Sequence, residues 1–393
     1  MARSRAPRLL FYSHNGVGVG HVQRQLRLAR AYARRHPGTG TLLVTGSHAV
    51  GSLRFPAGVD FVKLPSIRMV DRYRSWVPRD VDLSIEEVMR MRADLLRQSV
   101  KRFKPDLLVA DFLPSGPYGE LIPALEELRR RGGTALAGFR DIVDEPAFVR
   151  ELWQETGVAR ALADHYAGAL VYGTKAVVDF ASEYGLADGA ESIHYVGYLG
   201  RRARPKLPPD CRAPFILATT GGGVDGGPLL RQFAAAAARL RPRLGGTWLA
   251  VAGPLLPDDE LALLAEEAER SGVTVARSLR RMGDLIAGAD VVVGMSGYNT
   301  ACELLSCSTP AVIVPRSGPS REQRLRAEWL ARWGRAEVLE PDGLEPAALG
   351  EAIERALGRV AQKALRVDLG GVAKALDLFD LAADGALESG AAA

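Results

Sequence analysis

The chain alternates short apolar runs with longer amphipathic segments along most of its 393 residues. In the first half, apolar runs typical of β-strands occupy residues 8–13, 41–45, 59–63, 107–110, 135–139, 169–172 and 194–196. Helical patterns lie between several of these runs, at residues 21–35, 84–103 and 118–131. Strands that alternate with helices predict βαβ units and a mostly parallel sheet.

A proline-rich stretch divides this pattern into two halves. Residues 200–209 read Gly-Arg-Arg-Ala-Arg-Pro-Lys-Leu-Pro-Pro and show no hydrophobic periodicity, which is typical of a linker. A second series follows, with strands expected at 215–219, 247–251, 274–276, 290–294, 311–314 and 336–339, and helices at 229–240 and 258–271. The sequence therefore predicts an N-terminal domain (1–200), a linker (201–209), a C-terminal domain (210–385) and a disordered tail (386–393). The helical end at 371–381 fits against either domain.

Each half is expected to be a doubly wound α/β domain. Ligands of open parallel sheets bind beyond the carboxyl ends of the strands. With two such domains, we expect them to face a central cleft that holds the site.

The segment from residue 289 to 323 reads as strand, glycine turn, helix, strand and polar loop. Gly294 and Gly297 bracket the turn, and Asn299 or Thr300 is expected to cap the helix. A helix N-terminus at the end of a strand favours an anion. Glu303, in the first turns of that helix, is placed to accept hydrogen bonds from hydroxyl groups beside the anion.

The next strand leads into a loop that carries Arg316, Arg321, Glu322 and Gln323. Phosphate at the helix start, a diol on a carboxylate and a sugar on the following loop are the chemistry of a nucleotide sugar. The alternative interpretation is an ordinary α/β unit with a well-capped helix.

A glycine-rich loop, with Gly18 and Gly20 before His21, follows the first strand and opens a helix. Glycines let the backbone turn sharply and approach phosphate. The loop is a poor dinucleotide fingerprint, because His21 replaces the third glycine and no acidic residue closes the second strand. A helix start lowers the pKa of His21 and keeps its imidazole neutral, as a general base requires. The alternative is a histidine that caps or packs at the loop.

Three other segments carry candidates for catalysis or for binding a second substrate that would receive the sugar, here called the acceptor. Asp111 ends the strand at 107–110 and is expected to orient His21 or bind the acceptor, unless it only caps a loop. Arg140 and Asp141 follow another strand and are acceptor-side candidates. The polar and aromatic segment 66–82, with Tyr73 and Trp76, suits an acceptor-binding loop or a mobile surface loop.

Composition excludes several classes of function. With 47% hydrophobic and 25% charged residues, the chain is ordinarily globular. No stretch approaches the ~20 apolar residues of a membrane span, and the N-terminus lacks an apolar signal-peptide core. We therefore expect a cytoplasmic protein, with peripheral contact to an anionic membrane left open. The net charge of +5 is spread along the chain, so no nucleic-acid partner is expected.

No metal or other cofactor is expected. The three cysteines, Cys211, Cys302 and Cys307, match no metal-ligand spacing. Asp80 and Asp82 have a D-x-D spacing that binds a metal-nucleotide in some other enzymes, but they precede a helix with no strand expected before them, and helix-start acidity explains them better.

These motifs resemble a known family. The chain is similar to GT-B-fold glycosyltransferases of the family 28 type, which include the N-acetylglucosaminyltransferase of cell-wall lipid synthesis, and most of all to uncharacterised bacterial glycosyltransferases predicted from sequence. The resemblance covers nearly the whole length and is more specific in the carboxyl half.

The resemblance assigns expected roles to individual residues. The family's first loop ends in Gly-His, which matches Gly20-His21, and Gly221, Gly222 and Gly223 match the loop under the sugar diphosphate. Leu279 falls at the main-chain contact to uracil. The family's S-G-x-x-T-x-x-E motif covers Ser296, Gly297, Tyr298, Asn299, Thr300 and Glu303, with phosphate at the helix start and ribose on Glu303. Glu322-Gln323 matches the pair that contacts the donor sugar. Arg280 and Arg281 replace acidic residues beside the base contact, which leaves dTDP- and GDP-sugars as alternative donors.

The resemblance implies an inverting, metal-independent transfer from a nucleotide sugar, chiefly a UDP-sugar, to a hydroxyl acceptor such as a secondary metabolite, a polysaccharide or a lipid. His21 would be the base. The run from Gly18 to Ala29 also resembles UDP-sugar hydrolases of pseudaminic acid synthesis, where the histidine activates water. A nucleotide-sugar hydrolase and a non-catalytic nucleotide-sugar-binding protein are therefore the alternatives.

Overall fold

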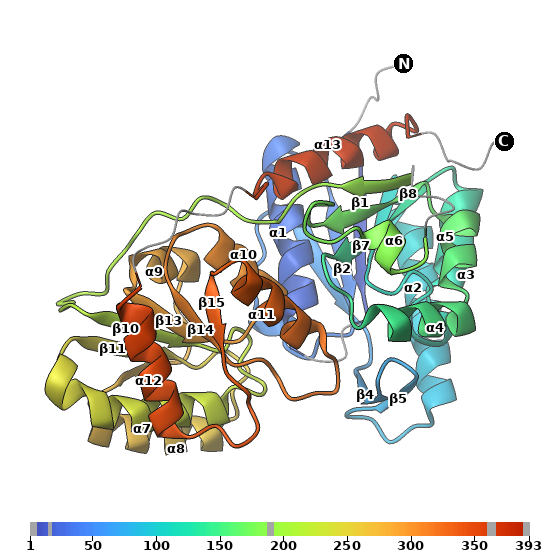
Figure 1. The fold of residues 1–393 in the computed structure, drawn as a ribbon. Coiled ribbons are helices and arrows are strands. Elements are labelled where there is room, and N and C mark those ends of the chain that lie inside the picture. The colour runs from blue at the N-terminus through green and yellow to red at the C-terminus, as the bar shows by residue number, and fades with distance from the viewer. Residues whose placement is uncertain (1–5, 15–17, 187–191, 360–366, 388–393) are drawn as a thin grey trace. The chain divides into compact units, whose positions relative to one another are not determined.

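The computed structural model describes residues 6–14, 18–186, 192–359 and 367–387. The chain forms two compact units: residues 1–199 with 370–393, and residues 200–369 (Figure 1). Both units are α/β, as the alternation of apolar runs predicts. Each is described separately below.

The first unit is built on a seven-stranded sheet in the order β3-β2-β1-β6-β7-β8-β9, in which all neighbours are parallel. Its strands are β1 (Leu9–Ser13), β2 (Thr41–Thr45), β3 (Val59–Lys63), β6 (Leu107–Asp111), β7 (Thr134–Arg140), β8 (Gly168–Tyr172) and β9 (Ile193–Tyr195). Its helices are α1 (Gly20–Arg35), α2 (Ile85–Phe103), α3 (Ile122–Arg130), α4 (Pro146–Thr156), α5 (Val158–His165), α6 (Phe180–Glu183) and α13 (Gly371–Ala383), with short 3-10 turns at Val50–Ser52 and Pro117–Gly119.

The central strand of this sheet is buried on both faces. Every residue of β1 is buried, as expected for a parallel strand covered on both sides. Leu10 and Tyr12 belong to the main hydrophobic core of the unit. Phe11 points to the other face, where its ring lies 5.8 Å from that of Phe379 in α13. Helices on both faces therefore bury the central strand completely.

The C-terminal helix α13 belongs to the first unit. It packs against α1 (Figure 1), with Phe379 also beside Tyr32 and with Arg35 paired to Asp377 at 2.6 Å. From the sequence, residues up to 385 were expected in the C-terminal domain. In the structure, residues 370–387 belong to the first unit. The physical reason is an apolar helix face whose partners lie far away in the sequence. Residues 388–393 of the expected tail lie outside the described residues.

The segment expected to be a long loop at 66–82 contains a hairpin. Strands β4 (Ile67–Asp71) and β5 (Ser75–Pro78) pair in an antiparallel manner. Ile67 and Trp76 form a small apolar cluster with Val88 and Met89 of α2. The hairpin is thus anchored by its own core, which the polar composition of the segment conceals.

The second unit contains a six-stranded parallel sheet in the order β12-β11-β10-β13-β14-β15. Its strands are β10 (Phe215–Thr219), β11 (Thr247–Val251), β12 (Thr274–Ala276), β13 (Val291–Gly294), β14 (Ala311–Ile313) and β15 (Ala336–Val338). Its helices are α7 (Gly227–Leu244), α8 (Asp258–Ser271), α9 (Met282–Gly288), α10 (Tyr298–Leu305), α11 (Glu322–Arg332) and α12 (Pro346–Leu357). The residues of the expected linker are hydrogen-bonded to Asp284 of α9. The Asp284 carboxylate accepts from the N–H of Arg204, and the Asp284 main-chain carbonyl accepts from the N–H of Lys206.

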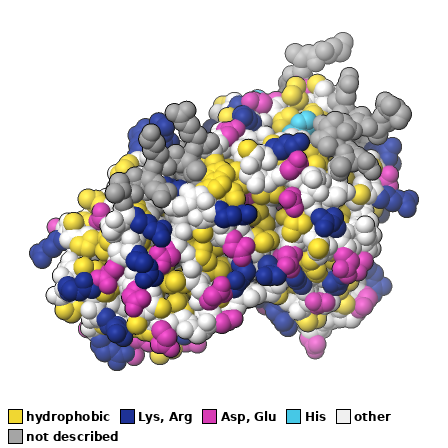
Figure 2. All heavy atoms as spheres, viewed as in Figure 1, with side chains coloured by type: hydrophobic (Ala, Val, Ile, Leu, Met, Phe, Trp, Pro, Cys, Tyr) yellow, Lys and Arg dark blue, Asp and Glu magenta, His cyan; other side chains and the backbone are white. Residues whose placement is uncertain are grey.

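The surface carries charges of both signs. On the face shown in Figure 2, basic and acidic side chains are interspersed over the part of the chain that the structure describes. Within that part, no helix is both long and apolar enough to cross a lipid bilayer.

Candidate active site

The first unit brings His21 and Asp111 together at the carboxyl edge of its sheet. Strands β1 and β6 are neighbours, and Ser13 at the end of β1 lies opposite Asp111 at the end of β6. Helix α1 begins at Gly20, so His21 stands at its first turn. The His21 Nδ1 atom lies 2.8 Å from Asp111 Oδ2. The adjacent placement of two strand ends produces this contact between residues 90 positions apart.

Arg24, one turn further along α1, fixes the carboxylate. Its Nη2 atom lies 2.7 and 2.6 Å from the two oxygens of Asp111, and both side chains are almost fully buried. Burial opposes ionisation of Asp111, but the positive charge of Arg24 and the contact with His21 outweigh it. The pKa of Asp111 is therefore held well below its ordinary value, and the group stays ionised.

The ionised carboxylate determines the tautomer of His21. His21 Nδ1 lies 2.8 Å from Asp111 Oδ2 and 3.0 Å from Arg24 Nη2. A carboxylate only accepts hydrogen bonds, and Arg24 Nη2 already donates to both oxygens of Asp111, so the proton is placed on Nδ1. Burial lowers the pKa of His21, with Arg24 and Arg140 adding to the effect and Asp111 opposing it. The imidazole is therefore neutral near pH 7, with its lone pair on Nε2. The sequence attributed the lowered pKa to the helix start, and the structure makes burial the main cause.

Aromatic side chains surround this histidine. The ring of His14 lies 5.5 Å and that of Phe112 lies 5.6 Å from the His21 ring. His14 is itself buried, its Nδ1 has no hydrogen-bond partner among the residues that the structure describes, and burial holds its pKa well below the ordinary value. These rings exclude water from one side of His21 and help to keep it neutral.

The sequence analysis gave no role to His14, Arg24 or Phe112. Two local signals point to them. His14 follows the first strand directly and Phe112 follows Asp111, so both leave strands at the same edge. Arg24 stands three residues after His21 in a helix, a spacing that places two side chains on one face.

The acceptor-side candidates divide into two groups. The Arg140 guanidinium lies 4.9 Å from the centre of the Phe112 ring, Tyr73 lies 5.2 Å from the same ring, and the ring of Trp76 lies 5.3 Å from His14. All three therefore adjoin the surroundings of His21. Asp141 instead serves its own loop, because its carboxylate accepts from the N–H of Ile142 and from the Tyr198 hydroxyl.

The glycine loop is described from Gly18 onward, and residues 15–17 lie outside the described residues. Gly18 has a positive φ of 70°, which a residue with a Cβ rarely adopts. At both Gly18 and Gly20 an added Cβ would meet nothing within 4 Å. The start of α1 has no side-chain cap, so its first turn presents main-chain N–H groups beside His21.

In the second unit, three loops leave adjacent strands at one edge of the sheet. Thr219 of β10 lies opposite Gly294 of β13, which lies opposite Ile313 of β14. The loops that follow carry the glycine run 221–223, the stretch 296–303 and the pair 322–323. Two of them touch, since a Cβ added at Gly221 would lie 3.6 Å from the hydroxyl of Thr300. The structure therefore brings together most of the predicted donor-binding residues.

Helix α10 begins two or three residues earlier than the capping hypothesis required. Its N-cap is Gly297, without a side-chain hydrogen bond, and Asn299 and Thr300 lie inside the first turn. The prediction that Asn299 or Thr300 caps this helix is wrong, because the extended backbone of Gly297 already ends the turn. An uncapped helix start exposes main-chain N–H groups, which suit an anion. Tyr298 is buried and Glu303 is half-buried on this helix.

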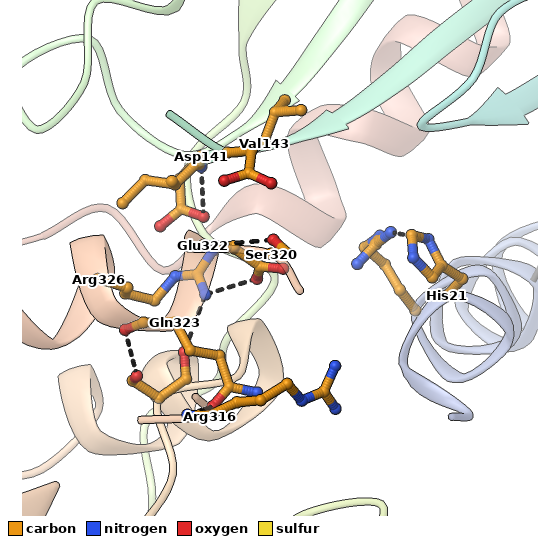
Figure 3. Close-up of polar contacts among 12 residues, drawn as sticks. His21, Asp141, Val143, Arg316, Ser320, Glu322, Gln323 and Arg326 are labelled. Atoms are coloured by element: carbon orange, nitrogen blue, oxygen red, sulfur yellow. Dashed lines mark hydrogen bonds and ion pairs between the residues drawn. The ribbon is translucent and has the colours of Figure 1, made fainter. Parts of the chain in front are cut away.

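Glu322 and Gln323 take part in a network around a buried arginine, Arg326 (Figure 3). Arg326 Nη1 donates to Glu322 Oε1 at 2.6 Å and to the carbonyl of Ser296 at 2.9 Å. The Ser296 hydroxyl donates to the carbonyl of Gln323 at 2.5 Å. Arg326 thus joins the loop after β13 to the start of α11. Its signal in the sequence was the spacing of four residues from Glu322, typical of a helix ion pair.

Two further side chains help to define the donor-side edge. The amide oxygen of Gln323 accepts from the N–H of Arg316 at 3.2 Å. Leu279 is 40% exposed on the loop after β12, at the end of the same sheet edge. Its exposure leaves its main chain accessible to a ligand.

The D-x-D aspartates lie just before helix α2. Asp80 and Asp82 are exposed ahead of α2, whose start is closed by a capping box between Ser84 and Glu87. Among the described residues, no group of three or more His, Cys, Asp or Glu side chains is arranged to hold a metal ion.

Comparison with known sequences adds independent findings. The family described as "Glycosyltransferase family 28 C-terminal domain" matches residues 260–366. The chain is 26% identical over 382 residues to a UDP-N-acetylglucosamine–N-acetylmuramyl-(pentapeptide) pyrophosphoryl-undecaprenol N-acetylglucosamine transferase from Acidothermus cellulolyticus, covering 93% of each chain. It is 39% identical over 89 residues to the enzyme of the same name from Halorhodospira halophila, covering 22% of this chain and 25% of that protein.

Solved structures share the fold over almost the whole length. The calicheamicin glycosyltransferase CalG4 superposes with a TM-score of 0.62 at 21% identity, covering 96% of this chain and 98% of that one. MurG of Acinetobacter baumannii gives 0.60 at 16% identity, covering 95% and 99%. At these identities the likeness establishes the fold.

Proposed function

Because this chain is a GT-B-fold glycosyltransferase of the family 28 type, which acts on a nucleotide-sugar donor, we propose that it transfers the sugar of a UDP-sugar to a hydroxyl acceptor with inversion and without an essential metal. The observation that carries the proposal is the contact of 2.8 Å between His21 Nδ1 and the buried carboxylate of Asp111. This contact leaves Nε2 as a lone-pair nitrogen, which is the form a general base needs.

In the proposed step, His21 Nε2 removes the proton of the acceptor hydroxyl as that oxygen attacks the anomeric carbon. The carbon–oxygen bond to the acceptor forms while the bond to the nucleoside diphosphate breaks on the opposite face, so the configuration inverts. The diphosphate leaves with the bonding electrons, and the imidazolium that forms is stabilised by Asp111. Base assistance of this kind contributes about 10²–10⁴ in rate.

The second unit is proposed to bind the donor. Main-chain N–H groups at the start of α10 and in the glycine loop 221–223 would stabilise the diphosphate, in the way that helix starts and glycine loops bind phosphate generally. Glu303, five residues after the helix start, would accept hydrogen bonds from the ribose hydroxyls. Glu322 and Gln323 would contact the sugar, which requires the side chain of Gln323 to exchange its bond to Arg316 for the ligand.

The choice of UDP-N-acetylglucosamine as the type of donor rests on the relatives. The protein from Acidothermus cellulolyticus carries that donor in its name and aligns with 93% of this chain. The exposed main chain at Leu279 supports a contact with a base at the same edge.

The test is incubation of the pure full chain with UDP-, dTDP- and GDP-sugars in EDTA, without acceptor, followed by mass spectrometry of nucleotide and free sugar. Binding of one UDP-sugar with little release of sugar supports a transferase. Rapid release of free sugar and nucleotide would instead establish a hydrolase, in which His21 activates water. Failure to bind any donor would refute both enzymes.

The variant His21→Ala separates a transferase from a binding protein once an acceptor is found. His21→Ala is expected to bind the donor within a few fold of the wild type while losing turnover. If turnover is retained in His21→Ala, the base assignment is wrong.

A further inference from the structure

The first unit contains a cavity of about 370 Å³ that no step of the proposed reaction uses. One wall comes from the β4–β5 hairpin, a second from the loop at 113–119 and a third from α4 and the start of α5. We propose that this cavity, here called the aromatic pocket, binds an uncharged planar aromatic group of the acceptor. The inference rests on the proposed function, since it names the chemical class of acceptor that His21 would activate.

Two rings in series link the pocket to the proposed base. Tyr73 lines the pocket, and its ring lies 5.2 Å from that of Phe112. Phe112 in turn lies 5.6 Å from the ring of His21. The hydroxyl of an acceptor held in the pocket would have to extend past these two rings to reach His21.

The walls are aromatic. Tyr73, Trp76, Tyr118 and Trp153 all line the pocket, and they come from three separate elements. Flat side chains favour a flat ligand, because offset stacking and edge contacts add to the burial of apolar surface. A long lipid chain would gain only the free energy of burying apolar surface, and it would exceed the volume of the pocket.

The walls also present no unpaired charge. Arg74 is the one charged residue among those that line the pocket, and it pairs with Glu151 at 2.7 Å and Glu155 at 3.1 Å. An ionised group that entered such a site would lose its hydration without gaining a partner of opposite charge. The pocket is therefore expected to reject an acceptor that carries a carboxylate at this position.

Three aromatic residues at this site have left-handed backbones. The φ angles are 59° for Tyr73, 76° for Phe112 and 49° for Tyr118. Each such conformation is unfavourable for a residue with a Cβ. Strained residues cluster where function fixes a side chain, and here two of them, Tyr73 and Tyr118, line the cavity while Phe112 contacts Tyr73.

The pocket is held in shape before any ligand arrives. The N–H of Trp76 donates to the Tyr118 hydroxyl at 3.1 Å and so joins the hairpin to the facing loop. Arg72 Nε donates to Asp144 Oδ2 at 3.0 Å and joins the hairpin to the segment before α4. A preformed pocket avoids the ordering cost that a mobile loop would incur on binding.

The experiment measures binding of 2-naphthol to the full chain by calorimetry. Two comparison ligands are 6-hydroxy-2-naphthoate, which adds a carboxylate, and decahydro-2-naphthol, which lacks aromatic rings. We expect 2-naphthol to bind about tenfold more tightly than either. Thr156→Phe, which fills the pocket from α4, is expected to weaken 2-naphthol by about tenfold or more. Gln154→Phe, on the same helix outside the pocket, is the matched control with an expected change below about twofold.

Ile122→Trp fills the pocket from α3 and serves if Thr156→Phe does not fold. Absence of saturable 2-naphthol binding, or binding that neither filling variant weakens, would overturn the inference. Equal affinity for decahydro-2-naphthol would also overturn it, because the pocket would then select apolar volume rather than an aromatic plane. Because binding is measured without a donor, its outcome is separate from that of the proposed transferase, which failure to bind any nucleotide sugar would refute even if 2-naphthol occupied the pocket.

Discussion

The two units have similar parallel sheets but equip the carboxyl edge of those sheets differently. All six histidines of the chain lie in residues 1–199, and the first unit buries an ionic cluster of His21, Arg24 and Asp111 at the ends of β1 and β6. The second unit has no histidine and places glycine loops and the uncapped start of α10 at the corresponding edge. One edge is built from titratable side chains and the other largely from main chain.

This difference indicates a division of labour. A base must change its charge during turnover, so it needs a side chain whose pKa the surroundings can adjust. A diphosphate keeps its charge, and fixed main-chain dipoles stabilise it without any proton transfer. The predictions below test this contrast between the units.

Removal of the base should give the largest effect. We expect His21→Ala to lower kcat by about 10²–10⁴ with UDP affinity unchanged within a few fold, because the donor contacts are proposed to lie in the second unit. Steady-state kinetics and calorimetry with UDP measure the two quantities. His194→Ala, a half-buried histidine on β9, is the control and should retain wild-type kcat. Loss of UDP binding in His21→Ala would break the proposed division.

The buried charges should differ in their contribution to stability. Arg24→Met leaves the 1%-exposed carboxylate of Asp111 without its main partner, and we expect a loss of about 3–5 kcal/mol in the first unit. Arg326→Met leaves the carboxylate of Glu322 without its arginine partner. Because Glu322 is 10% exposed and reaches solvent more easily, we expect a smaller loss of stability, about 1–3 kcal/mol, in the second unit. Hydrogen exchange in β6 and β13 under increasing denaturant follows the two units separately. A larger loss for Arg326→Met would reverse the contrast.

Acid should affect turnover before it affects donor binding. Burial lowers the pKa of His21 from 6.5, so the base stays neutral to a lower pH than an exposed imidazole, and kcat/KM should fall only below about pH 6.5. The unfolded chain binds more protons than the folded one in that range, so the first unit also loses stability as the pH falls through it. The lowered pKa of Asp111 adds a loss that begins below its ordinary value of 3.8. Affinity for a UDP-sugar, measured by calorimetry, should stay level between about pH 5.5 and 7, because its diphosphate is esterified at both ends and takes up no proton in this range, and because the second unit lacks histidine. A parallel decline of both quantities would contradict this prediction.

Two glycines give the smallest and most specific contrast. Gly297 has an ordinary φ of −60° and room for a Cβ, so Gly297→Ala should leave stability unchanged while weakening UDP binding if phosphate lies against that helix start. Gly18 has φ 70°, so Gly18→Ala should cost about 1 kcal/mol of stability and leave UDP affinity unchanged. Thermal unfolding and UDP titration of both variants test the pair. Unchanged UDP affinity in Gly297→Ala would move the phosphate away from α10.

The sequence predicted much of the fold because parallel strands and amphipathic helices leave local signals. Each of the strands expected in both halves is present within about one residue, since a run of β-branched residues such as 291–293 is recognisable without its neighbours. The positions of His21 at a helix start and of Asp111 at a strand end could likewise be predicted from neighbouring residues. The hairpin at 67–78 was missed because its apolar contacts are made with α2 rather than within the segment.

The sequence alone determined the two α/β halves, the strand positions and the histidine after the first glycine loop, because periodicity and chain direction are properties of neighbouring residues. Only the tertiary structure decided that α13 packs on the first unit, that Arg24 and Asp111 hold the tautomer of His21, and that Gly297 rather than Asn299 or Thr300 begins α10. Each of these depends on which strand ends are adjacent in a sheet, or on the backbone angles at one residue. Strand order joins residues some 90 positions apart, and no local pattern encodes it.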